Sequence, residues 1–116
     1  LTVKILNDRY GIQVRGGCSC AGTYGHYLLN VDPWMSKRIT EKIAHGDLSE
    51  KPGWVRVSIH PTMTNDDVDL IAEAISEVRK NIDRWSSDYN YDNHRNEFVC
   101  VNGDPVLDVG QLFKFR

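Results

Sequence analysis

A long run of apolar residues at helical spacing is the feature of this sequence that most constrains its fold. These residues recur at steps of three and four, at Val68, Ile71, Ile75, Val78, Ile82 and Trp85. The spacing predicts an amphipathic helix with one continuous apolar stripe, about five turns long, that ends on a core tryptophan. Thr64 and Asp67 stand in the positions of a capping box. The acidic residues here are therefore interpreted as capping and surface groups, not as paired catalytic carboxylates: Asp66, Asp67 and Asp69.

A strand is the expected partner of this stripe. Residues 54–60 alternate between apolar and polar side chains after a predicted turn at Pro52 and Gly53, which is typical of a half-buried strand. One face, predicted to pack on the long helix, carries Val55, Val57 and Ile59. The opposite face carries Trp54, Arg56, Ser58 and His60. Residues 12–15 alternate in the same way, so Ile12 and Val14 are expected inside and Gln13 and Arg15 outside.

Local signals predict the other elements. They are a helix over 2–10 that ends at Gly11, a glycine-rich loop over 16–22, a short helix over 24–29, a helix over 33–45 capped by Asp32, and a hairpin with strands 88–92 and 97–101. No element is assigned to residues 102–116. Short strands mixed with helices predict an α+β domain with a short, mostly antiparallel sheet and helices packed on one face.

Composition narrows the partners of the chain. Its 116 residues fit one domain. A formal net charge of −2 lacks the basic excess of proteins that bind nucleic acid or anionic membranes. No apolar run approaches the ~20 residues of a membrane span, and no leader peptide is recognised. Three cysteines, an odd number, fit free thiols in a reducing compartment, so a cytoplasmic location is expected.

The glycine-rich loop holds two reactive candidates. Cys18 and Cys20 lie just before a predicted helix, where thiolates are stabilised. Most free cysteines are buried apolar residues, so both interpretations stay open. Together with His26 and Cys100, they also form a possible set of zinc ligands. The single residue between Cys18 and Cys20 is a tighter spacing than zinc sites usually have, so no metal site is predicted.

Two arginines are predicted beside this loop, on the face of the sheet away from the long helix. A guanidinium matches a carboxylate or a phosphate through two parallel hydrogen bonds. A single surface arginine is usually only a solvated charge. Arg15 and Arg56 together, next to glycines that allow close approach, predict an anion site. Ser58 and His60 share this face, although a single histidine is more often structural.

Two segments of the sequence carry a resemblance to a known family. The first is LNDRYGIQVRGGCSCAG at 6–22, followed by Tyr24-Gly25-His26, and the second is GWVRVSIH at 53–60, followed by TNDDVD at 64–69. In this order they resemble the C-terminal region of class V aminotransferase-like enzymes, which include cysteine desulfurases and selenocysteine lyases. The likeness covers about residues 2–85, and the hairpin near Tyr89 and Tyr91 is similar to extensions of some members. It divides the single domain 1–116 into a family-like core, 1–85, and a hairpin and tail extension, 86–116.

The resemblance implies a fold, a cofactor and three residue roles. These enzymes are fold-type I transferases that hold pyridoxal 5'-phosphate on a lysine of a large domain, and this cofactor carries the carbanion chemistry. Cys20 matches the thiol that attacks the substrate sulfur in desulfurases. Arg56 matches the arginine that binds the substrate carboxylate, and Arg15 matches the arginine ahead of the cysteine loop, which is expected to help position the substrate. The implied substrate is a small amino acid, cysteine or selenocysteine, and the implied assembly is a homodimer of the full-length enzyme.

The sequence lacks the cofactor-binding part of this family. It has no Ser/Thr-x-His-Lys segment and it opens on Leu1 without a methionine. We therefore expect a C-terminal small domain, cut from a longer enzyme, whose partner is the large domain of the same chain. Alone it is expected to bind no cofactor and to be inactive. Two alternatives stay open: an aminotransferase or epimerase of the same class in which Cys20 has no sulfur chemistry, and a stand-alone domain that binds sulfur or a metal.

Overall fold

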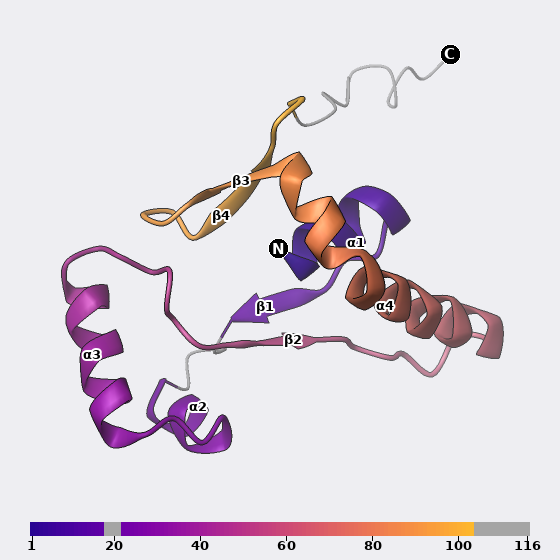
Figure 1. The fold of residues 1–116 in the computed structure, drawn as a ribbon. Coiled ribbons are helices and arrows are strands. Elements are labelled where there is room, and N and C mark those ends of the chain that lie inside the picture. Colours follow the sequence, from indigo (N-terminus) through magenta and orange to yellow (C-terminus); the bar gives the residue numbers. More distant parts are fainter. Residues whose placement is uncertain (18–21, 104–116) are drawn as a thin grey trace, which may run out of the picture.

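The computed structural model describes residues 1–17 and 22–103, in which α-helices and short strands alternate along the chain. The elements are α1 (Thr2–Tyr10), β1 (Arg15–Gly17), α2 (Gly22–Leu28), α3 (Pro33–Ala44), β2 (Trp54–Arg56), α4 (Asn65–Trp85), the 3₁₀ turn η1 (Ser86–Asp88), β3 (Tyr89–Asp92) and β4 (Glu97–Cys100). The predicted α+β class is confirmed. The described strands form two separate antiparallel pairs, β1 with β2 and β3 with β4 (Figure 1).

The helix boundaries follow the local signals of the sequence. Gly11 ends α1 with a left-handed φ of 67°, as a C-cap glycine does. Asp32 begins α3 by accepting a hydrogen bond from the backbone N–H of Trp34 at 2.8 Å. At α4, Thr64 and Asp67 form the predicted capping box, in which each side chain accepts from the backbone N–H of the other. The predicted helices and the hairpin are therefore confirmed, with small shifts at their ends.

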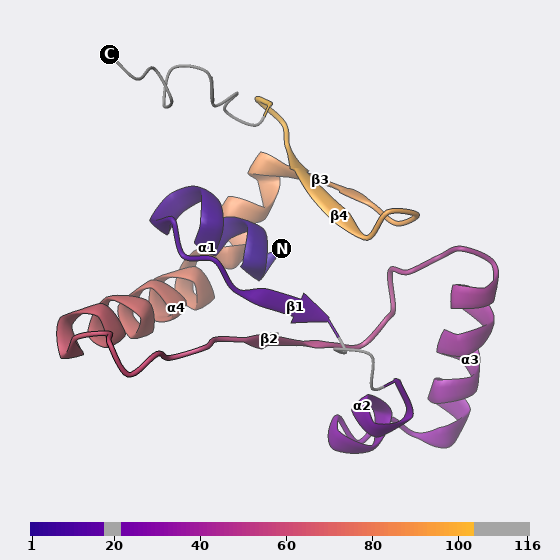
Figure 2. The same cartoon turned by 180° about the vertical axis from the view of Figure 1, so that it is seen from behind.

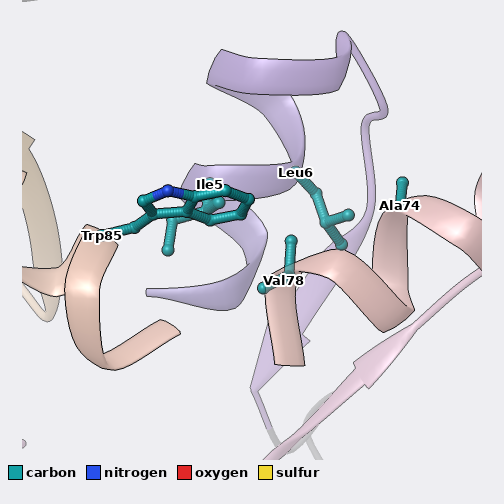
Figure 3. Packing of buried hydrophobic residues seen from close by; sticks show 5 residues of the cluster. All are labelled: Ile5, Leu6, Ala74, Val78 and Trp85. Atoms are coloured by element: carbon teal, nitrogen blue, oxygen red, sulfur yellow. The ribbon is translucent and has the colours of Figure 1, made fainter. Parts of the chain in front are cut away.

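The core lies between α1 and α4. Ile5 and Leu6 are fully buried in α1, and they pack against three residues of α4, Ala74, Val78 and Trp85 (Figure 3). The predicted partner is therefore wrong for the buried part of the α4 stripe, which α1 covers. Of the strand face expected to cover the stripe, Val57 is half-buried and lines the same pocket as Ile71 of α4, whereas 39% of Val55 and 54% of Ile59 are exposed. A second amphipathic helix buries two apolar faces at once, whereas a strand of three residues offers little area.

The first strand pair lies further along the chain than predicted. Strand β1 covers Arg15–Gly17 instead of residues 12–15, so Gly16 and Gly17 belong to a strand and not to a loop. Ile12 and Val14 pack on the core from outside the ladder. The glycines explain this register, because a Cβ at Gly16 would stand 2.9 Å from Val3 Cγ2 of α1. Glycine lets β1 lie close to that helix, because a Cβ here would force the Val3 side chain to turn away.

Helices α2 and α3 form an arm that stands apart from the α1–α4 core (Figures 1 and 2). A hydrogen bond joins the two helices, with His26 Nδ1 2.6 Å from Ser36 Oγ. The segment after α3 reaches the turn of the β3–β4 hairpin, where the backbone N–H of Leu48 donates to the carbonyl of Asn93 at 3.1 Å. The arm buries Ile39 but leaves large apolar side chains in solvent, namely Tyr24, Tyr27, Leu28, Leu29 and Trp34.

Candidate anion site on the first strand pair

Arg15 and Arg56 are direct partners across the β1–β2 ladder. Opposite residues of an antiparallel pair project from the same face, with their Cβ atoms roughly 4.5–5.5 Å apart. Both side chains are exposed. Neither makes an ion pair or a hydrogen bond with any residue in 1–17 or 22–103. The structure therefore brings the two predicted arginines together and gives neither of them an acidic partner within the described chain.

The face that carries the arginines points away from α1. Gly16 and Val55 face each other one position along the ladder, and successive strand residues alternate between faces. Val3 of α1 lies against Gly16, so α1 covers the side opposite the arginines. The prediction of an open arginine face is thus confirmed, although a helix other than the expected one covers the back.

A glycine lies beside the arginine pair on the same face of the ladder. Gly17 and Trp54 are the next partners on the arginine face. Gly17 adopts a φ of 105°, and among the described residues beyond its chain neighbours none has an atom within 4 Å of where its Cβ would stand. The described residues therefore leave Gly17 uncovered on this face, directly opposite Trp54. Gly53 lies against the backbone at the end of β1. A Cβ on Gly53 would stand 2.9 Å from Gly17 Cα.

The electrostatics of this face favour anions. Like charges directly opposite each other destabilise a strand pair, so an anion that binds both guanidinium groups relieves a repulsion as well as making hydrogen bonds. Sequence reasoning placed Trp54 on this face but did not single it out. Its spacing of two residues from Arg56 was the available signal, because residues i and i+2 of a strand share a face.

Two other residues predicted on this face do not join the ladder. Strand β2 ends at Arg56, before Ser58 and His60. His60 is engaged within its own loop, where Nδ1 accepts a hydrogen bond from the backbone N–H of Thr62 at 3.3 Å and lies 2.8 Å from the Thr62 hydroxyl. These contacts agree with a structural role for the histidine.

The cysteine candidates are placed only in part. Cys18 and Cys20 lie outside the described residues. Cys100 ends β4, whereas His26 belongs to α2, and these two elements lie on opposite sides of the molecule (Figures 1 and 2). Within residues 1–17 and 22–103, no three side chains of His, Cys, Asp or Glu come together as metal ligands. The described part of the chain therefore gives no support to a zinc site that joins His26 to Cys100.

The lysines of the described chain do not fit a covalent site for pyridoxal phosphate. Such a lysine is activated by desolvation or by a nearby cation, but every described lysine is at least partly open to solvent. Lys42 pairs with Glu50 at 2.5 Å, and this contact is the main cause of the lowered pKa of Glu50. Lys80 pairs with Glu77 at 3.1 Å. The arrangement of the described residues thus suits anion binding and offers no anchor for this cofactor.

Comparison with known proteins identifies no family for this chain. No family model matches the sequence, and neither a curated protein nor a solved structure gives a significant match. None of the described helices has both the length and the apolar character needed to cross a membrane.

Proposed function

We propose that this chain is the small C-terminal domain of a pyridoxal-phosphate-dependent enzyme of the class V aminotransferase type, acting on cysteine or selenocysteine. The sequence resemblance over about residues 2–85 suggests the family. In this proposal the full-length enzyme is a cytoplasmic homodimer, and the domain described here supplies the side chains that hold and attack the amino acid.

The observation that carries the proposal is the pairing of Arg15 with Arg56 on an open face. An enzyme that acts on an amino acid must hold its carboxylate, and a guanidinium does so through two parallel hydrogen bonds. Arg56 is the proposed carboxylate ligand. Arg15 lies directly opposite and is the proposed positioning residue, because its charge fixes the side from which the carboxylate enters.

The cofactor belongs to another part of the proposed enzyme. The described lysines are exposed or paired with acids, so no step of the reaction is assigned to a cofactor bound by this chain. The large domain of the same protein is the proposed partner that holds pyridoxal phosphate. It follows that the 116-residue chain alone should bind no pyridoxal phosphate and release no sulfur from cysteine.

Cys20 is the proposed sulfur acceptor, on the basis of its sequence position alone. Its thiolate would form an S–S bond to the substrate sulfur while the carbon–sulfur bond breaks. The electron pair of the broken bond stays with the substrate carbon, which then takes a proton. The sulfur remains on Cys20 as a persulfide, ready for transfer to an acceptor thiol.

The decisive experiment uses the full-length protein that contains this chain. Its visible spectrum is recorded before and after addition of cysteine, and sulfide and persulfide are assayed in the same sample. A cofactor band that changes together with sulfur release is the expected result. A band that changes without sulfur release would contradict the desulfurase proposal in favour of an aminotransferase or epimerase. Absence of any band would contradict the enzyme proposal and favour a scaffold domain.

Two variants test the residue roles in that protein. Arg56→Ala should raise KM for the amino acid by more than tenfold, as expected for the loss of a charge-assisted hydrogen bond of roughly 1.5–3 kcal/mol. Cys20→Ser should abolish sulfur release and leave the cofactor band unchanged. An unchanged KM removes Arg56 from the site, and retained sulfur release removes Cys20. Arg79→Ala, on the exposed surface of α4, is the matched control and should alter neither property.

A further inference from the structure

The geometry points to a site for a small dianion, in which Arg15 and Arg56 together bind a ligand that carries two negative charges. This inference rests on the proposed function only for its biological meaning, and its physical basis is the strand pair itself. It goes beyond the binding of one carboxylate by Arg56, because it assigns both guanidinium groups to a single ligand.

The first argument is charge balance. The two guanidinium groups start from opposite positions of the ladder, and no carboxylate within residues 1–17 or 22–103 pairs with either of them. One monoanion leaves one positive charge without a partner and so relieves the repulsion only in part. A dianion neutralises both. The preference for a dianion should therefore exceed what a single exposed arginine could give.

The second argument is shape. The Arg15–Arg56 pair is followed on the same face by Gly17 and Trp54, and the described residues leave Gly17 uncovered there. A compact ligand can therefore reach both guanidinium groups beside the backbone of β1. Trp54, directly opposite Gly17, is half-buried. Two guanidinium groups that start from directly opposite positions suit one ion with two negative charges, such as a phosphate or a short dicarboxylate.

In the proposed enzyme, this site selects a substrate class. The α-carboxylate of the amino acid supplies one negative charge, so the second must come from an acidic group on the side chain. The inferred class is thus an amino acid with an acidic side chain, in addition to the neutral sulfur amino acid of the proposed function. Free phosphate and a dicarboxylate share the required chemistry, and separate titrations distinguish them.

The test is a titration of the 116-residue chain followed by amide NMR. Malonate, inorganic phosphate and acetate are added separately at constant ionic strength, at a pH where phosphate is mainly doubly charged. Malonate or phosphate should bind at least about tenfold more tightly than acetate, with the largest amide shifts at Gly16, Gly17 and Val55. If only one of the two dianions, malonate or phosphate, binds more tightly than acetate, the result would support the dianion site and identify its ligand type.

Variants decide whether both arginines take part. Arg15→Gln and Arg56→Gln should each lower the affinity for the dianion to that for acetate, while Arg79→Gln on α4 should leave it unchanged. Equal affinity for acetate and for both dianions in the unaltered chain would overturn the dianion inference and leave the proposed carboxylate role of Arg56 standing. An equal loss in Arg79→Gln would also overturn it, because binding would then reflect only net charge. By contrast, absence of a cofactor band in the full-length protein would refute the proposed enzyme activity and leave the anion site untouched.

Discussion

Leu6 is the residue whose truncation tests the packing of α1 on α4 most directly. It is fully buried, and it points toward Val78 of the facing helix (Figure 3). Leu6→Ala removes three carbon atoms from this contact. At about 0.8 kcal/mol per buried methylene, the lost transfer free energy is about 2.4 kcal/mol. The cavity left behind adds to it, so the free energy of unfolding should fall by roughly 3–4 kcal/mol.

Urea unfolding followed by circular dichroism measures this loss. Leu70→Ala in α4 is the matched control, because it removes the same atoms from a side chain that is 54% exposed. It should cost less than about 1 kcal/mol. Equal losses in the two variants would refute the assignment of the core to the α1–α4 interface.

A double-mutant cycle sharpens the same test. Leu6→Ala and Val78→Ala act on side chains of one buried cluster, so their effects should depart from additivity by about 0.5 kcal/mol or more. Additive losses would mean that the two residues do not share a contact. The cycle therefore checks which residues meet in the core, whereas the single variants check only that each is buried.

Three further predictions concern backbone approach and ionisation. Gly53→Ala should lower the free energy of unfolding by roughly 1–3 kcal/mol, and by more than Gly16→Ala. The new methyl group meets the backbone of β1 in the first variant, but in the second it meets the Val3 side chain, which can turn away. Equal urea midpoints for the two variants would contradict this. Hydrogen bonds from Thr64 lower the pKa of Asp67, so this carboxylate stabilises the fold above its ordinary pKa and ceases to do so as the pH falls through the lowered value. In Asp67→Asn, the free energy of unfolding should therefore fall less steeply as the pH is lowered into the acid range. The same pH dependence in the variant and the unaltered chain would contradict the capping box. Burial, more than the nearby carboxylate of Asp8, raises the pKa of Tyr89, so Tyr89→Phe should remove a late component from an absorbance titration of tyrosinate; loss of an early component would be the wrong outcome.

Local chemistry made the helices and the hairpin predictable. A glycine after α1, an aspartate before α3 and a reciprocal pair at the start of α4 each satisfy backbone groups within a few residues. Such signals do not depend on the rest of the fold. The same holds for the polar turn between β3 and β4, where Asp92 Oδ1 accepts from the backbone N–H groups of His94 and Arg95.

The packing of these elements could not be predicted in the same way. Periodicity shows that α4 has an apolar stripe, but it does not show which surface covers it. Two apolar surfaces could pack on this stripe, namely the strand face with Val55 and Ile59 and the helix face with Ile5 and Leu6. The helix face covers it, and this choice depends on shape and buried area that no local pattern records. The register of β1 was missed for a similar reason, because the close approach of Val3 to Gly16 is a contact between distant elements.

The candidate site was predictable in its residues and not in its geometry. Alternation placed Arg15 and Arg56 on outward faces, and the structure makes them direct partners. That they face each other depends on the register of two strands nearly forty positions apart, which alternation alone leaves open. Cys20 rests on sequence alone, since it lies outside the described residues.

The separation of the α2–α3 arm from the core gives this protein three built-in fluorescent reporters. Trp34 lies in the arm and is 68% exposed, Trp54 lies on the arginine face of β2, and Trp85 is buried in the core. Versions that keep one tryptophan at a time would emit from three distinct environments. Denaturation of the core should shift the emission of Trp85 strongly to the red while Trp34 changes little, and a ligand over Gly17 should alter Trp54 alone. Light emission can thus follow the arm, the ladder and the core separately in one small chain.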